Sequence, residues 1–133
     1  MTVFVDTSAW FATVNVKDRH HERASELLRA ESRLTTSTFV LVETWLLLQS
    51  KTSFAVAEGL RTGAARLEHT SAGDLQHAWQ IANAYHDQSF SLVDRTSFAM
   101  MERLEISKVV AFDDDFIIYR YGPDHRQAFE VLR

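Results

Sequence analysis

Cysteine is absent from the 133-residue sequence, and proline and glycine are scarce, with one and four residues respectively. The absence of cysteine excludes disulfide bonds, thiolate zinc sites and cysteine nucleophiles. It also fits a reducing compartment, so we expect a cytoplasmic protein. The scarcity of glycine and proline is typical of a helix-rich fold with short connections.

Long hydrophobic runs are also missing. The longest apolar run, residues 39–48, is too short to span a bilayer and contains Glu43, so we expect no association with a membrane. Residues 1–11 have no basic segment and are interrupted by Asp6, which argues against a signal peptide.

Basic residues are outnumbered, with 14 Lys and Arg against 18 Asp and Glu, which gives a formal net charge of −4. This sign is unfavourable for a nucleic-acid-binding protein, because contacts with phosphates require Lys and Arg. A few acidic side chains gathered in one metal site would account for the excess, so the charge is only a weak argument against nucleic acid. The length and the 46% apolar composition predict one globular domain over residues 1–133.

Short apolar segments alternate with segments of helical periodicity. We expect strands over residues 2–5, 34–37, 67–70, 91–93, 109–112 and 128–132, and helices over 7–15, 18–30, 38–50, 54–66, 74–86 and 96–104. This alternation predicts an α/β fold with a parallel central sheet sandwiched by helices, in three layers.

Aspartates follow three of the expected strands. Asp6, Asp94 and Asp113 each come directly after a strand, and ligands of parallel sheets bind beyond the carboxyl ends of the strands. We therefore expect these carboxylates at one edge of the sheet. Each also has a simpler interpretation, because Asp6 and Asp94 precede helices that they could cap, and Asp113 opens an acidic run that could be a solvated turn.

Glu43 is harder to explain in a simpler way, because it lies within the strongly apolar segment FVLVETWLLL. Burial of an unpaired carboxylate costs several kcal/mol, and a metal ion or a basic partner removes that cost. A surface-facing glutamate is the alternative. Together with the three aspartates, Glu43 would form an all-oxygen site that suits Mg²⁺ or Mn²⁺ and does not suit zinc.

Four short motifs give the sequence a family resemblance. They are VDTSAW at residues 5–10, TSTFVLVETW at 36–45, LVDRTSFAMM at 92–101 and AFDDDF at 111–116. In this order they resemble the motifs of PIN-domain proteins, and in particular of the VapC-type toxins of toxin–antitoxin pairs. The resemblance covers nearly the whole chain.

The resemblance implies a PIN-like fold and a Mg²⁺- or Mn²⁺-dependent endoribonuclease that hydrolyses RNA by attack of water and leaves a 5′-phosphate. It also implies a homodimer and a cognate antitoxin that covers the active-site groove. The residues implied are Asp6, Glu43, Asp94 and Asp113 as catalytic metal ligands, Asp115 as a further ligand, and Thr7, Ser8 and Ser97 as groups that position water or phosphate.

Other functions remain open or are disfavoured. A non-catalytic binding module and a housekeeping or DNA-directed nuclease of the same fold remain alternatives. A phosphoacceptor receiver domain needs an acidic pair where Val5 stands, and a haloacid-dehalogenase phosphatase needs Asp in place of Ser8. A calcium loop starting at Asp113 would need glycine in place of Ile118.

The remaining motifs are assigned to packing or to the surface. His20 and His21 lack a second histidine one turn later, so we expect a solvated helix face there. The helix over 74–86 is expected to pack through Leu75, Ala78, Trp79 and Ala82, and Trp10, Phe11 and Trp45 are expected in the core. Candidate RNA-phosphate contacts are Arg19, Arg95, Arg120 and Arg126.

Overall fold

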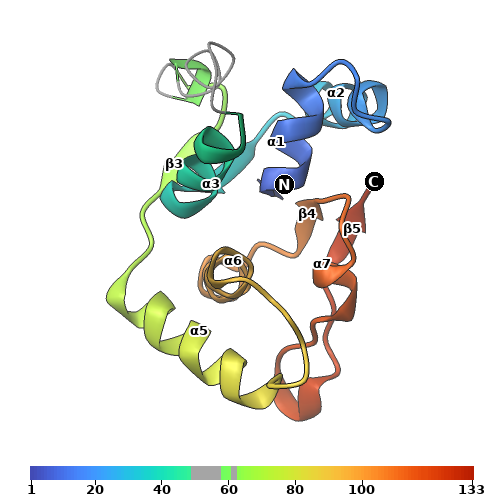
Figure 1. The fold of residues 1–133 in the computed structure, drawn as a ribbon. Coiled ribbons are helices and arrows are strands. Elements are labelled where there is room, and N and C mark those ends of the chain that lie inside the picture. The colour runs from blue at the N-terminus through green and yellow to red at the C-terminus, as the bar shows by residue number, and fades with distance from the viewer. Residues whose placement is uncertain (49–57, 61–62) are drawn as a thin grey trace.

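The structure is a computed structural model that describes residues 1–48, 58–60 and 63–133. Strands and helices alternate along the chain (Figure 1). They are β1 (Val3–Val5), α1 (Thr7–Val14), α2 (His21–Ala30), β2 (Leu34–Ser37), α3 (Thr38–Leu48), β3 (Arg66–Glu68), α5 (Ala72–Ala84), α6 (Leu92–Arg103), β4 (Lys108–Val110), α7 (Asp115–Ile118), a 3-10 turn (Pro123–His125) and β5 (Glu130–Leu132).

The strands form one parallel sheet in the order β3-β2-β1-β4-β5. Strand β1 is central, and all of its residues are fully buried, as expected for a strand that is covered on both faces. The chain runs outward from β1 to β2 and β3, and then returns to place β4 on the other side of β1. The predicted three-layer α/β/α fold with a parallel central sheet is confirmed.

The sheet order determines where a ligand can bind. Because β2 and β4 lie on opposite sides of β1, the connections that leave β1 and β4 diverge at the carboxyl edge of the sheet. Such a switch point leaves a crevice in open parallel sheets. Asp6 follows β1 directly, and Asp113 lies shortly after β4, so both lie at this crevice.

Helix α6 connects this edge to the rest of the core. It packs along α5 and contacts α3, and Figure 1 shows it beside α5 and inside the curve of the chain. Phe98 on α6 is fully buried and stacks on Tyr119, with ring centroids 4.3 Å apart. Met100 and Met101 are also buried, so α6 packs into the core through these three side chains.

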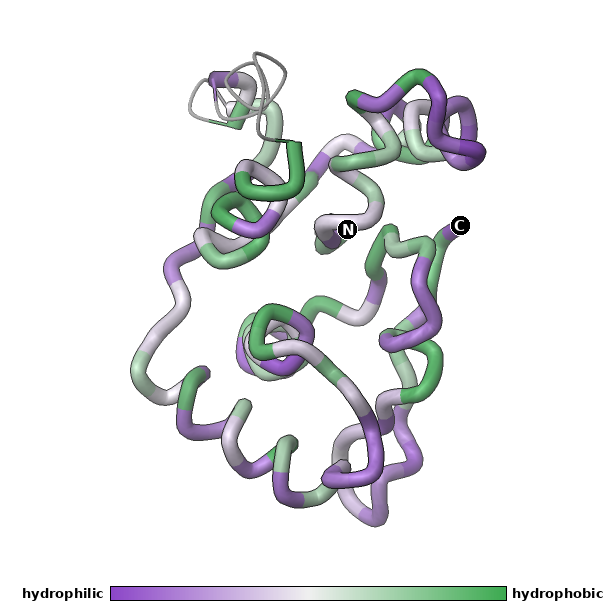
Figure 2. The backbone as a smooth tube through the Cα atoms, in the orientation of Figure 1, coloured by the Kyte–Doolittle hydropathy of each residue, from purple (hydrophilic) through white to green (hydrophobic). Residues whose placement is uncertain are grey.

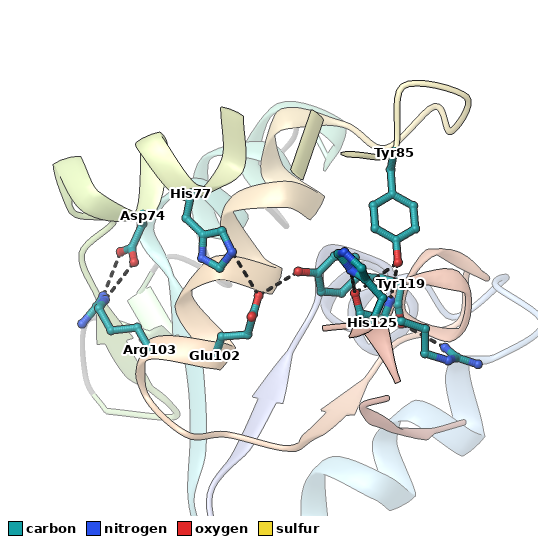
Figure 3. A network of polar contacts seen from close by, with 8 residues as sticks. Asp74, His77, Tyr85, Glu102, Arg103, Tyr119 and His125 are labelled. Carbon is teal, nitrogen blue, oxygen red and sulfur yellow. Dashed lines mark hydrogen bonds and ion pairs between the residues drawn. The ribbon is translucent and has the colours of Figure 1, made fainter. Parts of the chain in front are cut away.

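A polar network fixes the C-terminal end of α6 (Figure 3). Arg103 donates two hydrogen bonds of 2.8 Å to Asp74, which also belongs to the capping box of α5. Glu102 accepts a 2.8 Å hydrogen bond from the Tyr119 hydroxyl and lies 3.6 Å from His77. The network joins α5 and the C-terminal segment to one end of α6, while the other end reaches the carboxyl edge of the sheet.

The predicted strand over 91–93 is wrong. Helix α6 already begins at Leu92, and Ser91 is its N-cap. The Ser91 side chain accepts from the Asp94 N–H at 3.0 Å, and the Asp94 carboxylate accepts from the Ser91 N–H at 3.1 Å. This capping box satisfies both donors, so the segment starts a helix and Asp94 lies in its first turn.

Three predicted core positions are also wrong. Trp79 is 70% exposed and Leu75 is 41% exposed, because α5 packs through Asp74, Ala78 and Ile81. Asp74 on this buried face is paired with Arg103, and the face overlaps the predicted one only at Ala78. Trp45 is 43% exposed on α3, whereas Trp10 is buried and donates to the Thr36 hydroxyl.

The other expected elements are present with ends shifted by a few residues. The predicted end of the helix over 38–50 and much of the helix over 54–66 lie outside the described residues. Figure 2 shows that α3 is one of the most hydrophobic stretches of the backbone, although several of its apolar side chains are exposed. Within the described ranges, every helix is too short or too polar to cross a lipid bilayer.

Candidate active site

Asp6 is placed by the end of strand β1. Its N–H donates to the Val110 carbonyl at 3.1 Å and thereby extends the pairing of β1 with β4 by one residue. Its backbone is still extended, with φ −82° and ψ 164°, and its carboxylate caps helix α1 by accepting from the Ser8 N–H at 3.3 Å. The side chain is only 2% exposed. The capping interpretation is therefore correct, but the carboxylate also has acidic neighbours.

Ser8 joins Asp6 to the segment that follows β4. Its hydroxyl donates to the Asp6 carboxylate at 2.8 Å and accepts from the Phe112 N–H at 3.0 Å. Phe112 precedes Asp113, so this one hydroxyl holds two segments together that are about a hundred residues apart in the sequence. The expected role of Ser8 toward water or phosphate stays a prediction, and its observed role is to position Asp6.

Three further carboxylates converge beside Asp6. One oxygen from each of Asp94, Asp113 and Asp115 lies within 4.8 Å of the others. Asp94 comes from the first turn of α6, Asp113 from the loop after β4, and Asp115 from the first turn of α7. Asp113 accepts from the Asp115 N–H at 3.2 Å, which fixes this loop. The charges of Asp113 and Asp94 act on Asp6, and the charge of Asp94 acts on Asp115.

Burial and mutual repulsion disfavour the ionised forms of these groups. Burial, followed by the charges of Asp113 and Asp94, raises the pKa of Asp6 to about 8. Burial, followed by the hydrogen bond and charge of Asp94, raises the pKa of Asp115 to about 7. Burial also raises the pKa of Asp94 and of Asp113. At neutral pH the cluster must therefore retain protons or bind a cation.

The residues present fit a divalent cation. The donors are all carboxylate oxygens, which hard cations prefer, and sulfur is absent from the site. Two buried hydroxyls, of Thr7 and Ser97, have no hydrogen-bond partner among the residues that the structure describes. Thr7 follows Asp6, and Ser97 lies one helical turn after Asp94, so both residues adjoin the carboxylates in sequence. Buried hydroxyls of this kind call for a bound water or ligand.

Glu43 occupies a different position. It lies half-buried on α3 in an apolar groove whose lining includes Phe39, Leu46 and Val93. Val93 precedes Asp94, so the groove reaches the neighbourhood of the cluster. Among the described residues, the set of carboxylates within 4.8 Å of one another contains Asp94, Asp113 and Asp115 and includes neither Glu43 nor Asp6. Asp6 still interacts with this set, because the charges of Asp113 and Asp94 raise its pKa. The role of Glu43 as a metal ligand therefore stays a prediction.

His20 differs from its expected solvated position. Its ring stacks on Phe112, with centroids 4.5 Å apart and planes 15° apart, and it is half-buried. No local pattern in the sequence signals this contact, because it depends on the placement of α2 against β4. The Ser91–Asp94 capping box, in contrast, was visible in the sequence as Ser-x-x-Asp.

Comparisons with known proteins agree with this geometry. Residues 3–121 match the PIN domain family. The "23S rRNA-specific endonuclease VapC20" of Mycobacterium tuberculosis is 36% identical over 119 residues, which cover 86% of this chain and 91% of that protein. The crystal structure of VapC20, described as a "Sarcin-Ricin loop cleaving toxin", matches with a TM-score of 0.83 over 86% of this chain and 92% of that one.

More distant structures share the fold alone. A toxin–antitoxin complex from Klebsiella pneumoniae matches with a TM-score of 0.69 at 13% identity, over 98% of this chain and 96% of that one. VapBC2 from Rickettsia felis, bound to a DNA fragment from its promoter, matches with a TM-score of 0.58 at 15% identity, over 86% and 89% of the two chains. From the family match and the VapC20 relative, we conclude that this chain belongs to the PIN-domain family.

Proposed function

We propose that this protein is a divalent-metal-dependent endoribonuclease of the VapC type, which hydrolyses RNA phosphodiester bonds at the carboxylate cluster. The observation that carries the proposal is the convergence of Asp94, Asp113 and Asp115 within 4.8 Å, beside the buried Asp6. Such a cluster has little use in a folded domain without a cation, because its members repel one another.

Asp6, Asp94, Asp113 and Asp115 would hold Mg²⁺ or Mn²⁺, and Glu43 would approach from α3. When bound, the cation supplies an activated water at neutral pH and stabilises negative charge on the phosphoryl group. Ser8 keeps the Asp6 carboxylate in one orientation. Asp115 is only half-buried, so it is well placed to exchange a proton with solvent. Thr7 and Ser97 would bind a water or a phosphate oxygen.

The relative suggests a substrate class. VapC20 is named for 23S rRNA and for cleavage of the sarcin–ricin loop, and it is similar to this chain over nearly all of its length. We therefore propose ribosomal RNA, and that hairpin first, as the substrate, which places the activity in the cytoplasm. Related structures that contain antitoxins support a cognate antitoxin as partner. The exposed apolar side chains of α3, including Leu46 and Leu47, are candidates for a contact with a second subunit.

The test is cleavage of a synthetic sarcin–ricin hairpin by the purified protein in Mg²⁺ or Mn²⁺. We expect specific cleavage by the wild type, and its loss in excess EDTA and in Asp6→Asn or Asp94→Asn. Asp124→Asn is the matched control, because Asp124 is exposed outside the site and asparagine tolerates its positive φ. Full cleavage by either cluster variant, or in EDTA, would contradict the proposal.

The toxin role needs a separate test in cells. Expression of the protein alone is expected to arrest growth, and co-expression of the neighbouring gene is expected to relieve the arrest. Asp6→Asn should also relieve it if the arrest depends on RNA cleavage. Arrest that persists with Asp6→Asn would show that the toxicity does not come from the cluster.

A further inference from the structure

We propose that a groove beside the carboxylate cluster binds the phosphates of the RNA strand next to the bond that is cut. The groove is lined by three arginines, Arg19, Arg23 and Arg133, by two aspartates, Asp113 and Asp114, and by His20 and Phe112. This inference rests on the proposed function and adds to it a binding site for the flanking strand.

The groove adjoins the cluster directly. Asp113 belongs both to the cluster and to the wall of the groove. A chain that occupies the groove therefore lies within reach of the reacting phosphate. The Ser8 hydroxyl accepts from the Phe112 N–H in the wall of the groove and donates to the Asp6 carboxylate. These two hydrogen bonds fix the wall and the cluster relative to each other.

The charges in the groove suit a polyanion. A bound cation neutralises charge at the cleaved phosphate, but the neighbouring phosphates of the strand still meet the acidic cluster. They require positive partners nearby, because phosphate contacts supply much of the affinity for nucleic acid. The groove places three arginines beside two aspartates in a chain whose net charge is −4, so positive charge is concentrated locally.

Two of these arginines are available to a phosphate. Arg19 is exposed and donates through Nε to the His20 ring, and within the described ranges it forms no ion pair with a carboxylate. Arg23 lies 3.5 Å from Glu26, but both side chains are more than half exposed. Such exposed pairs contribute little energy and exchange readily for another anion. Arg133 is already paired with Asp114 at 3.0 Å, so we assign it a smaller role.

The floor of the groove orients the first of these arginines. His20 is stacked flat on Phe112 at 4.5 Å, and its ring accepts the Arg19 Nε hydrogen bond at 3.0 Å. The contacts thus run from Arg19 through His20 to Phe112, which directly precedes Asp113. This path orders one arginine relative to the cluster before RNA binds, which reduces the entropy lost on binding.

Binding is tested with the fluorescein-labelled sarcin–ricin hairpin in Mg²⁺, in an Asp6→Asn background that does not cut it. In that background, Arg19→Ala with Arg23→Ala should weaken binding about tenfold at 0.1 M salt. It should also reduce the slope of log affinity against log salt by roughly 1.5, since each lost phosphate contact removes about 0.7 to 0.9. Arg19→Lys with Arg23→Lys should keep most of the slope, because the charge is retained.

The matched control is Arg29→Ala with Arg33→Ala, which removes two exposed arginines outside the groove. The proposal predicts at most a twofold change in affinity for this control. In the cleaving protein, the groove double variant should raise KM and leave kcat within about threefold, because the arginines do not contact the reacting atoms. Equal affinity and slope in the groove variant and the control would overturn the inference.

The other outcomes separate this inference from the proposed function. Cleavage by the wild type together with control-like binding by the groove variant would overturn the groove and leave the nuclease intact. Arginine-dependent binding without cleavage by the wild type would support the groove and contradict the nuclease. The groove double variant could also bind RNA as the wild type does and yet fail to bind the purified antitoxin. That result would assign the groove to a protein partner and overturn the inference.

Discussion

Asp6→Asn should stabilise the metal-free protein while it abolishes cleavage. In the folded chain, burial and the charges of Asp113 and Asp94 raise the pKa of Asp6 to about 8, from 3.8 for an ordinary aspartate. Between these values the folded protein keeps a proton that the unfolded chain has lost. The contribution of Asp6 to the stability of the metal-free protein is therefore fully present below about pH 4 and is lost as the pH rises toward 8.

The size of this loss of stability follows from the difference between the two pKa values of Asp6. Each pH unit between them costs about 1.4 kcal/mol, so at pH 7 the cost is about 4 kcal/mol as an upper bound. The true cost is smaller than this bound because the neighbouring carboxyl groups share the bound protons with Asp6. Asparagine is neutral, nearly the same size and an equally good N-cap, so the variant removes this cost and keeps the cap. At roughly 3 °C per kcal/mol, Tm should rise by as much as about 12 °C at pH 7.

The assay is thermal unfolding of wild type and Asp6→Asn between pH 4.5 and 8.5, in EDTA and in saturating Mg²⁺. In EDTA the difference in Tm should be small at pH 4.5 and grow with pH. Mg²⁺ should raise the Tm of the wild type more than that of the variant, because it binds the ionised cluster. A variant that is less stable than the wild type at pH 8 in EDTA, or a difference that does not depend on pH, would refute this reasoning.

Three further predictions concern single positions. Ser8→Ala removes the donor to Asp6 and the acceptor of the Phe112 N–H, so urea unfolding should show a loss of about 1–2 kcal/mol, and hairpin cleavage should slow. Asp74→Ala removes the acceptor of both Arg103 hydrogen bonds, so the free energy of unfolding should fall by about 1–3 kcal/mol. The kcat of hairpin cleavage should stay unchanged because this pair lies at the far end of α6, and a large fall in kcat would contradict that separation. Glu43→Gln should weaken Mn²⁺ binding in a calorimetric titration if Glu43 is a ligand, and an unchanged affinity would assign Glu43 to the apolar groove alone.

The sequence predicted two members of the site for the correct reason. Strand β1 and strand β4 are buried on both faces and read as short apolar runs, so the acids that follow them were recognisable as strand-end residues. Parallel strands share their carboxyl edge, and this placed Asp6 and Asp113 together. The order of the strands was not predicted, because nothing local in the sequence specifies which strands pair.

The prediction that Asp94 belongs to the site is based partly on a strand that does not exist. The predicted strand over 91–93 is the start of α6, and Asp94 reaches the cluster from the first turn of that helix. The capping box formed with Ser91 was the signal that should have decided between the two structures. The resemblance to PIN-domain motifs did not depend on the strand and led to the same residue.

Tertiary contacts account for the remaining errors. Trp79 is exposed because α5 packs through Asp74, Ala78 and Ile81, a face that overlaps the predicted one only at Ala78, and the buried Asp74 is paired with Arg103 of α6. The stack of His20 on Phe112 depends on two elements that are far apart in the sequence. Both features arise from contacts between elements, which hydrophobic spacing within one element does not report.

The central claim is that Asp6, Asp94, Asp113 and Asp115 share a divalent cation, and crystals soaked in Mn²⁺ test it most directly. We predict an anomalous difference peak within coordination distance of oxygens from at least three of these residues. An ordered cluster with no peak at millimolar Mn²⁺, or a peak bound by other residues, would contradict the claim.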